Sequence, residues 1–360
     1  MLAVSRKAFL AGLGATAFTT AMPSLAEKAA ASTSSSIKDD PAFVHHRERL
    51  NGRKQHFVTA GEGKAVLFLH GFPDLWRTWR AQMRAVADAG YMAIAPDLRG
   101  FGETEGAANP QSYTSIDVMG DLIAILDHLG VDQVTVVAHD WGTNAGWAAV
   151  QLRPDRFVGI MAISVPWLPR GERSLPQILR EDAPADYYLP WFLNEGPPDA
   201  EFNADPETFL RRIFYTNSAE RPGDTPPPMI TVGGSLVAAL DEPPGEMKFL
   251  PNDELAIYVE AFRKSGATSA FNAYRSLHRS WELMGAWADF VPNAPARTLV
   301  GDKDVVAGMP GMRDVFDAQS KWLPQGRPTI WIENCGHFAQ MEQPDEVSRH
   351  VVDFVRETRG

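Results

Sequence analysis

Asp140 has the clearest potential for chemistry, because it ends an apolar run and precedes small residues in VTVVAHDWGTNAG (134–146). A strand that turns sharply into a helix needs small residues beside the turn, and the turn lifts its central side chain off the sheet edge. Serine usually occupies that place, but an aspartate is already ionised at neutral pH. The pattern predicts a nucleophile that forms an alkyl ester at carbon. The same pattern also fits an aspartate that caps the following helix.

Two backbone amides could stabilise an oxyanion beside Asp140. The stretch VLFLHGFPD (66–74) is a strand-like run that ends in His-Gly-Phe-Pro upstream of the nucleophile. The N–H groups of Phe72 and of Trp141, which follows the nucleophile, can point at the same developing charge. The Phe72-Pro73 bond is a candidate cis peptide, which would fix this tight turn.

An acid and a histidine follow two later strand-like runs. GDKD (301–304) places Asp302 and Asp304 after one run, and ENCGHF (333–338) places His337 after the next. The chain order is therefore nucleophile, acid and histidine, which suits a catalytic triad. We expect Asp304 to orient His337, because it lies deeper in its loop than Asp302. Asp97 precedes the nucleophile in the chain and is expected to fix a turn.

The elements that must position these residues alternate along the chain. Ser115–Leu129 carries apolar residues at helical spacing, and Gly130 follows as a helix stop. Continuous apolar runs that alternate with helices predict an α/β fold with a mostly parallel, doubly wound sheet. The strand-like runs are Ala65–Leu69, Met92–Ala95, Val134–Ala138, Val158–Ile163, Thr298–Val300 and Thr329–Ile332.

The alternation stops in the middle of the chain. Residues from about 166 to 290 are rich in proline and aromatic residues and contain helical segments such as Ala256–Lys264 and Ala270–Leu283. A structureless loop of that length is implausible in a compact domain. We therefore expect an α/β core made of residues 40–165 and 292–360, with a helical cap inserted at 166–291.

The N-terminus has the features of an export signal. Arg6 and Lys7 precede the apolar run Ala8–Met22, and small residues lie before a potential cleavage point after Ala26. The run is shorter than the ~20 residues that span a bilayer, so no stable membrane insertion is expected after cleavage. We predict a signal peptide at 1–26, a flexible linker at 27–39 and a periplasmic location. SRKAFL (5–10) resembles a twin-arginine signal in which Lys7 replaces the second arginine.

The composition excludes several classes of protein. The chain has 360 residues, a formal net charge of −11, 44% hydrophobic residues and a single cysteine, Cys335. One cysteine excludes a disulfide scaffold, and the apolar content excludes a wholly disordered chain. An acidic chain repels phosphate backbones, so nucleic acid is not an expected partner.

Seven stretches, in this order, resemble those of epoxide hydrolases with the α/β-hydrolase fold, including the catalytic domain of the mammalian soluble enzyme and its bacterial relatives. They are HGFPDLWRTWR (70–80), APDLRGFGET (95–104), VVAHDWG (136–142), YVEAFRKSG (258–266), FNAYRSLHRSW (271–281), GDKDVV (301–306) and ENCGHFAQMEQPDEV (333–347). The resemblance covers nearly everything after residue 45. Ala138 departs from it, because glycine is more usual there, but alanine is also small.

The resemblance implies that the core supplies the nucleophile, acid and base, and that the cap supplies the proton donors. Asp140 would be the nucleophile, Asp304 the acid and His337 the base that activates water. Two cap tyrosines would protonate the epoxide oxygen: Tyr274 matches the second, and Tyr188 is preferred for the first with its neighbour Tyr187 as the rival. The product would be a vicinal diol, made without a metal or organic cofactor from a small apolar epoxide. The side chains expected to line the substrate site are Trp76, Tyr187, Trp191 and Phe338.

Two other functions are compatible with the same residues. Haloalkane dehalogenases share the fold and the aspartate, and in them the tryptophan after the nucleophile binds halide, as Trp141 could. Fluoroacetate dehalogenases carry arginines just after the aspartate, where this chain has Trp141 and Thr143. A non-catalytic binding protein of the hydrolase fold is a more distant alternative, because the triad residues are intact.

Overall fold

The computed structural model describes residues 41–183, 187–223, 230 and 234–359. The predicted signal peptide and linker lie outside these residues. Within them, no helix is both long enough and apolar enough to cross a membrane.

One sheet of eight strands, in the order β1-β2-β4-β3-β5-β6-β7-β8, organises the described chain. Neighbours from β4 to β8 are parallel, whereas β2 pairs antiparallel with both β1 and β4. The predicted mostly parallel sheet is therefore confirmed, with an antiparallel hairpin added at one edge. The strands are β1 (Val44–Leu50), β2 (Arg53–Ala60), β3 (Ala65–Leu69), β4 (Met92–Pro96), β5 (Val134–His139), β6 (Phe157–Ile163), β7 (Ala296–Gly301) and β8 (Ile330–Ile332).

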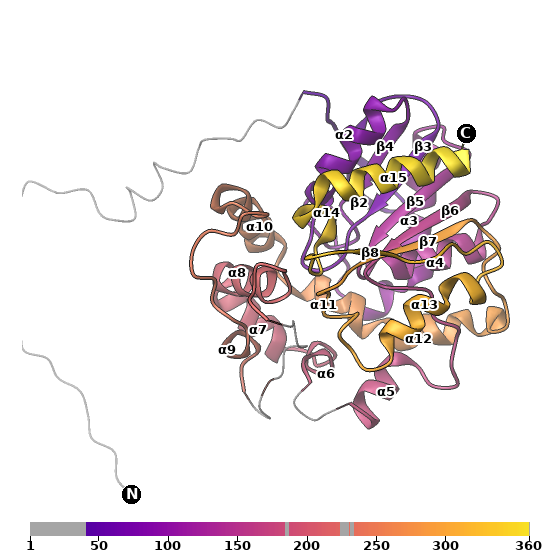
Figure 1. The fold of residues 1–360 in the computed structure, drawn as a ribbon. Helices are drawn as coiled ribbons and strands as arrows, with labels where there is room; N and C mark the ends of the chain where they lie inside the picture. The colour runs from indigo at the N-terminus through magenta and orange to yellow at the C-terminus, as the bar shows by residue number, and fades with distance from the viewer. Residues whose placement is uncertain (1–40, 184–186, 224–229, 231–233, 360) are drawn as a thin grey trace, which may run out of the picture. The chain divides into compact units, whose positions relative to one another are not determined.

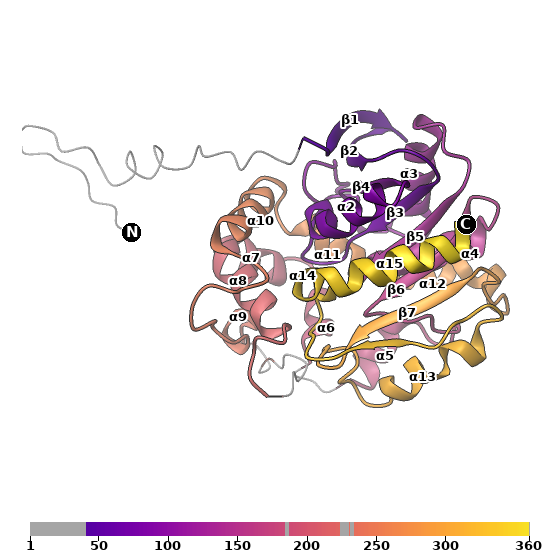
Figure 2. The ribbon, with the colours of Figure 1, turned by 45° about the horizontal axis from the view of Figure 1, so that its top comes forward.

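Helices cover both faces of this sheet. Successive side chains of a strand point to opposite faces, and β3 shows the result. Val66 and Phe68 belong to the apolar cluster that contains side chains of α2 (Arg80–Asp88) and α15 (Pro344–Arg359), which run close together in Figures 1 and 2. Leu67 and Leu69 belong to the cluster that contains side chains of α3 (Ser115–His128) and α4 (Gly142–Leu152).

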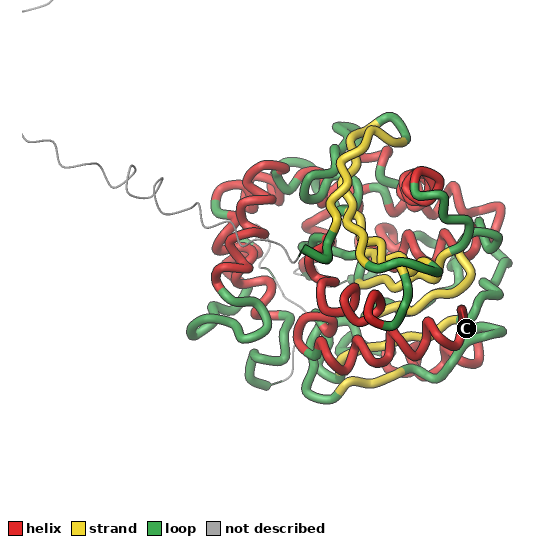
Figure 3. The backbone as a smooth tube through the Cα atoms, turned by 90° about the horizontal axis from the view of Figure 1, so that it is seen from above, coloured by secondary structure: helices red, strands yellow, loops and turns green. Residues whose placement is uncertain are grey.

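The helices between β6 and β7, here called the cap, have an apolar core of their own. Fully buried phenylalanines such as Phe202, Phe209, Phe262 and Phe271 fill it. Figure 1 shows α7 to α10 grouped at one side of the sheet, and Figure 3 shows the same group from above. The cap helices are α5 (Leu175–Glu181), α6 (Tyr188–Phe192), α7 (Pro197–Ala204), α8 (Pro206–Thr216), α9 (Leu236–Ala239), α10 (Asn252–Ser265), α11 (Thr268–Arg275), α12 (Leu277–Leu283) and the 3₁₀ turn η3 (Met284–Trp287).

A buried ion pair joins the cap to the core. Arg77, in the 3₁₀ turn η1 (Trp76–Trp79), donates from Nε and Nη2 to the two carboxylate oxygens of Glu254 in α10, at 2.9 and 3.0 Å. Arg80 approaches the same carboxylate at 2.9 Å. A two-pronged contact of this kind fixes orientation as well as distance.

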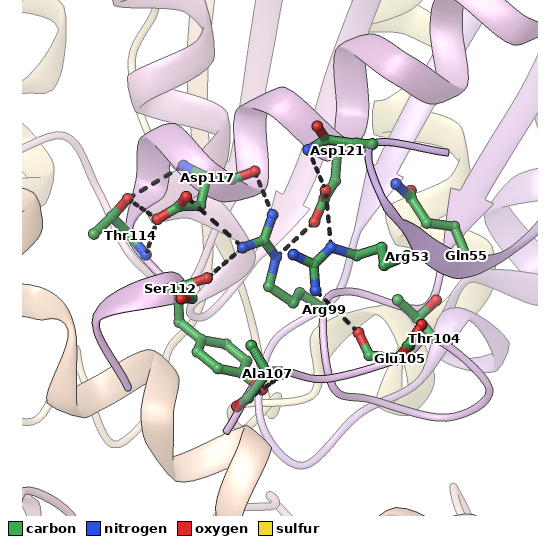
Figure 4. Close-up of polar contacts among 12 residues, drawn as sticks. Arg53, Gln55, Arg99, Thr104, Glu105, Ala107, Ser112, Thr114, Asp117 and Asp121 are labelled. Carbon is green, nitrogen blue, oxygen red and sulfur yellow. Dashed lines mark hydrogen bonds and ion pairs between the residues drawn. The ribbon is translucent and has the colours of Figure 1, made fainter. Parts of the chain in front are cut away.

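A second buried arginine, Arg99, lies at the centre of a group of polar contacts in the core (Figure 4). The Arg99 side chain, 4% exposed, donates to Asp121 at 2.7 Å and to the carbonyl oxygens of Asp117 and Ser112. The 3₁₀ turn η2 (Pro110–Ser112) lies here, and the next residue, Tyr113, accepts at its carbonyl from the Ser276 hydroxyl at 2.8 Å. Arg99 thus stabilises the core surface that carries the second half of the cap.

The C-terminal part of the core supplies two further helices. They are α13 (Met312–Trp322), which follows β7, and the short α14 (Ala339–Glu342), which follows β8 and leads into α15. The loop between β8 and α14 carries His337, and the loop after β7 carries Asp304. The topology therefore brings both residues to the end of the sheet where Asp140 leaves β5.

Candidate active site

Asp140 occupies a strained backbone position between β5 and α4. Its φ of 48° lies in the left-handed region that non-glycine residues rarely adopt. The neighbouring chain is very close: a Cβ atom on Gly142 would lie 2.5 Å from the carbonyl oxygens of Leu69 and His70. A Cβ on Gly71 would lie 2.3 Å from Asp140 Oδ1. These glycines are what allow the carboxylate to be held between two strand ends.

The two oxygens of the Asp140 carboxylate have different partners. Oδ1 accepts the Phe72 N–H at 2.9 Å, and Oδ2 lies 3.5 Å from Nε2 of His337. The Phe72-Pro73 bond is cis, as expected. Burial raises the pKa of Asp140, but the hydrogen bond and charge of His337 outweigh burial, so the net pKa is lowered. The carboxylate is thus ionised, with Oδ1 held and Oδ2 facing the imidazole.

His337 lies between two carboxylates. Its Nδ1 is 3.1 Å from Asp304 Oδ1, whereas Asp302 instead accepts the Cys335 N–H at 3.2 Å. Burial lowers the pKa of His337, but the charges and hydrogen bonds of Asp304 and Asp140 outweigh burial and raise it well above its ordinary value. The His337 side chain is 8% exposed, so these charges act with little screening by water. The structure thus brings together the three predicted triad residues.

Several contacts around His337 were not predicted from the sequence. The Ser164 hydroxyl lies 3.0 Å from His337 Nδ1, and Ser164 has a φ of 73° at the end of β6. His139 approaches the His337 carbonyl oxygen through Nε2 at 2.8 Å, and its Nδ1 lies 3.2 Å from Asp74 Oδ2. Asp74 and His139 lie inside two of the seven stretches named above, HGFPDLWRTWR (70–80) and VVAHDWG (136–142), which is the signal that could have drawn attention to them.

Two cap tyrosines lie near the Asp140 carboxylate. Tyr274 in α11 is 4% exposed, and its ring lies edge-on to that of Trp141 with centroids 4.6 Å apart. Burial raises the pKa of Tyr188 and of Tyr274 well above the ordinary value, and the charge of Asp140 raises both further. Both hydroxyls are therefore protonated and able to donate.

The adjacent tyrosine, Tyr187, has a different environment. Its hydroxyl donates to Sδ of Met309 at 3.6 Å, and its ring lies edge-on to Tyr188 with centroids 5.1 Å apart. Asp140 and Asp304 both contribute to the raised pKa of Tyr188. The two adjacent tyrosines thus differ in environment, and Tyr188 is the one influenced by the charges of Asp140 and Asp304.

Aromatic side chains surround the carboxylate and the tyrosines. Phe72 packs on Tyr274, with ring centroids 6.0 Å apart, and on several cap phenylalanines. Phe338 packs on His337 at 5.0 Å and on Phe214 at 4.7 Å. The partly buried Trp191 packs against the cap core and donates from its indole N–H to Glu201 at 3.2 Å.

The structure does not bring Trp76 to this cluster. Its ring packs against Phe43, His45 and His56, with centroids 5.6, 5.2 and 6.5 Å away. It belongs to the apolar cluster between the sheet and α2 and α15. The Trp76 side chain points into that cluster, while the backbone N–H of Trp76 donates to Asp97 at 3.1 Å.

Asp97 fixes the turn around it, in line with its position ahead of the nucleophile. Besides Trp76, it accepts the Glu103 N–H at 3.1 Å and approaches Nδ1 of His56 at 2.7 Å. Among the residues that the structure describes, no group of three or more His, Cys, Asp or Glu side chains is arranged to hold a metal ion.

Sequence comparison identifies the family to which this site belongs. Residues 64–344 match the family described as alpha/beta hydrolase fold. The chain is 36% identical over 320 residues to epoxide hydrolase 2 of Siraitia grosvenorii, a match that covers 87% of this chain and 98% of that protein. The chain belongs to the epoxide hydrolases of the α/β-hydrolase fold.

Solved structures of epoxide hydrolases share the fold over the same region. An epoxide hydrolase mutant from Vigna radiata aligns with a TM-score of 0.82 at 35% identity, covering 88% of this chain and 99% of that one. Epoxide hydrolase I of potato, Solanum tuberosum, aligns with a TM-score of 0.81 at 32% identity and the same coverage. The resemblance and the fold class predicted from the sequence are both confirmed.

Proposed function

We propose that this epoxide hydrolase converts an epoxide to a vicinal diol through a covalent ester on Asp140. The observation that carries the proposal is the arrangement around one carboxylate. Asp140 Oδ1 accepts the Phe72 N–H, Oδ2 faces His337, and the charge of the carboxylate acts on the hydroxyls of Tyr188 and Tyr274. A strained ether needs a nucleophile at carbon and a proton donor at oxygen, and this arrangement offers both.

In the first step, Oδ2 of Asp140 attacks one epoxide carbon from the side opposite the tyrosines. The bond from that carbon to the epoxide oxygen breaks, and the carbon is inverted. The oxygen takes a proton from the hydroxyl of Tyr188 or Tyr274, which leaves a hydroxyalkyl ester on Asp140. Oδ2 is the attacking atom because Oδ1 is already held by a backbone N–H at 2.9 Å.

In the second step, His337 removes a proton from water, and the water oxygen attacks the carboxyl carbon of Asp140. Charge develops on Oδ1, where the Phe72 N–H already points. The Trp141 N–H is the second donor that the sequence predicts. One such donor contributes about 10²–10³-fold in rate. The ester C–O bond to the alkyl group then breaks, and the departing alkoxide takes the remaining proton of the added hydroxyl, which gives the diol and restores the Asp140 carboxylate. The proton held by His337 returns to the tyrosinate.

Ester formation itself prepares His337 for this second step. In the free enzyme, Asp304 and Asp140 both raise the pKa of His337. Esterification makes Asp140 neutral, so one of the two raising charges disappears and the pKa of His337 falls. A larger fraction of His337 is therefore unprotonated, and able to accept a proton from water, at the stage where a base is required.

The decisive test measures products and trapped protein with styrene oxide. We expect diol formation by the unmodified enzyme, no turnover by Asp140→Ala, and alkylated protein by mass spectrometry for His337→Gln. Loss of the general base should slow ester hydrolysis by about 10²–10⁴-fold. Absence of any adduct with an epoxide that the enzyme turns over would contradict the covalent mechanism.

The dehalogenase alternative has a separate outcome in the same test, namely halide release from a bromoalkane. The Trp141 ring, which a halide would approach, lies edge-on to Tyr274 with centroids 4.6 Å apart, so the cap tyrosine occupies one side of it. The phenylalanines around the carboxylate favour a small apolar epoxide as substrate.

We also propose that the protein is exported and processed after Ala26. The proposal is supported by Arg6 and Lys7, the short apolar run Ala8–Met22 and the small residues near the cleavage point. Expression of the full chain in a bacterial host, followed by fractionation and N-terminal sequencing, should give a periplasmic form that begins at Glu27. Arg6→Lys should block that form only if export uses the twin-arginine route. Full-length protein in the cytoplasm alone would contradict export.

A further inference from the structure

The backbone around His337 is held by hydrogen bonds to groups outside its loop. Three consecutive N–H groups, those of residues 336 to 338, donate to a side-chain carboxylate or to a backbone carbonyl of another segment. Gly336 and Phe338, on either side of the histidine, donate to Glu342 at 2.9 and 3.0 Å. His337 itself donates to the carbonyl oxygen of Asn217 at 2.8 Å. The Glu342 carboxylate therefore accepts hydrogen bonds from the residues on both sides of His337.

The same carboxylate also reaches the cap. Glu342 accepts the Ala219 N–H at 2.8 Å, on the segment that follows α8. Contact between that segment and the His337 loop is tight, because a Cβ on Gly336 would lie 2.6 Å from Ala219 N and from Asn217 O. Glu342 is thus the common acceptor for three backbone donors, two from the core and one from the cap.

We propose that Glu342 is a positioning residue that couples the cap to the hydrolysis step, by fixing the backbone that carries His337. The inference rests on the proposed function, in which His337 acts as a base only after the ester has formed. A displacement of about 1 Å at a reacting group can reduce a rate by 10²-fold. Loosening the His337 loop should therefore affect ester hydrolysis more than ester formation.

Glu342→Gln tests this with little change in size. An amide keeps one acceptor oxygen, but its NH₂ group cannot accept a backbone N–H, so at least one of the three donors loses its partner. In rapid-quench single turnovers with styrene oxide, we expect hydrolysis of the Asp140 ester to slow about tenfold or more, and ester formation to slow by less than about twofold. The alkylated fraction, followed by mass spectrometry, should rise accordingly.

Two further variants make the outcome specific. Glu346→Gln removes a carboxylate four residues later, which pairs with the exposed Arg349 and the partly exposed His350 of α15, and should match the unmodified enzyme. Glu342→Asp keeps both acceptor oxygens on a shorter side chain, and should show the same imbalance at smaller amplitude. The aspartate variant also provides the measurement if Glu342→Gln does not fold.

The failures are distinguishable. Equal slowing of both steps in Glu342→Gln and Glu342→Asp, or slowing of neither, would overturn the positioning role while leaving the covalent mechanism intact. If His337→Gln fails to trap an adduct, the proposed function fails instead, whatever the Glu342 variants do.

Discussion

At the scale of single residues, the proposed chemistry depends on the protonation state of the His337 imidazole. His337 lies 3.1 Å from Asp304 and 3.5 Å from Asp140, and both carboxylates raise its pKa. Asp140→Asn removes the carboxylate charge, as ester formation does, and keeps the size of the aspartate. We expect it to lower the pKa of His337, because it removes a charge that stabilises the imidazolium. An NMR titration of the His337 ring measures this, and an unchanged pKa would contradict the proposed charge coupling.

The oxygen atom of the attacking water provides a second test of the roles of Asp140 and His337. If water attacks the carboxyl carbon of Asp140, its oxygen enters the protein in the first turnover. We therefore expect a single turnover in water labelled with heavy oxygen to place the label in the peptide that contains Asp140, and to leave the first diol unlabelled. Mass spectrometry of the digest and of the diol measures both. Label in the diol would indicate direct attack of water on the epoxide.

The sequence predicted which of the candidate triad residues lie together far better than it predicted the contacts that hold them. Asp140, Asp304 and His337 each follow an apolar strand, so spacing alone suggested that they meet. Glu342 acts on backbone N–H groups, which leave no trace in residue types. Tyr187 and Tyr188 are adjacent and chemically identical, so only the positions of Met309 and Asp140 in space separate them.

At the scale of elements, the relative position of α6 and α11 determines where Tyr188 and Tyr274 lie. Arg275, directly after Tyr274, donates to the carbonyl oxygen of Asn194, just beyond α6, at 3.2 and 2.6 Å. It also pairs with Asp199 in α7. Because the guanidinium is a rigid fork, lysine cannot reproduce this set of contacts.

Arg275→Lys should therefore slow ester formation, by about tenfold, with little effect on ester hydrolysis. Single-turnover rates with styrene oxide measure both steps. Arg279→Lys is the matched control, because Arg279 pairs with Glu282 on the exposed surface of α12. If the two variants behave alike, Arg275 has no special part in placing the tyrosines.

The same scale explains which elements the sequence predicted. Buried parallel strands are continuous apolar runs, so all six predicted runs correspond to strands, although their ends differ by a few residues. The hairpin of β1 and β2 was missed because its first strand, VHHRERL, is largely polar and exposed at the sheet edge. Charged side chains on an edge strand obscure the alternation of apolar and polar residues by which a strand is predicted, although they also prevent pairing with another chain.

At the scale of the whole molecule, the cap and the core must stay aligned, because each supplies part of the site. The Glu254 carboxylate receives Arg77 and Arg80 at this boundary, and the Glu254 and Arg77 side chains are buried. Removing one partner of a buried pair is strongly destabilising, because the other charge is left without compensation.

We expect Glu254→Ala to lower the free energy of unfolding by about 3 kcal/mol. Glu260→Ala, on the exposed face of the same helix, should lower it by less than about 1 kcal/mol. Urea unfolding followed by tryptophan fluorescence measures both variants. Equal effects would show that the boundary pair does not stabilise the molecule.

The single cysteine gives this molecule a built-in reporter. Cys335 is fully buried two residues before His337, and burial raises the pKa of its thiol far above the ordinary value. A thiol reagent needs both access and a thiolate, so labelling should occur only when the His337 loop opens or the protein unfolds. The labelling rate of the unaltered enzyme thus measures how often its catalytic loop leaves its place, and a tightly bound epoxide analogue should slow it. A rate equal to that of a free thiol would contradict this use.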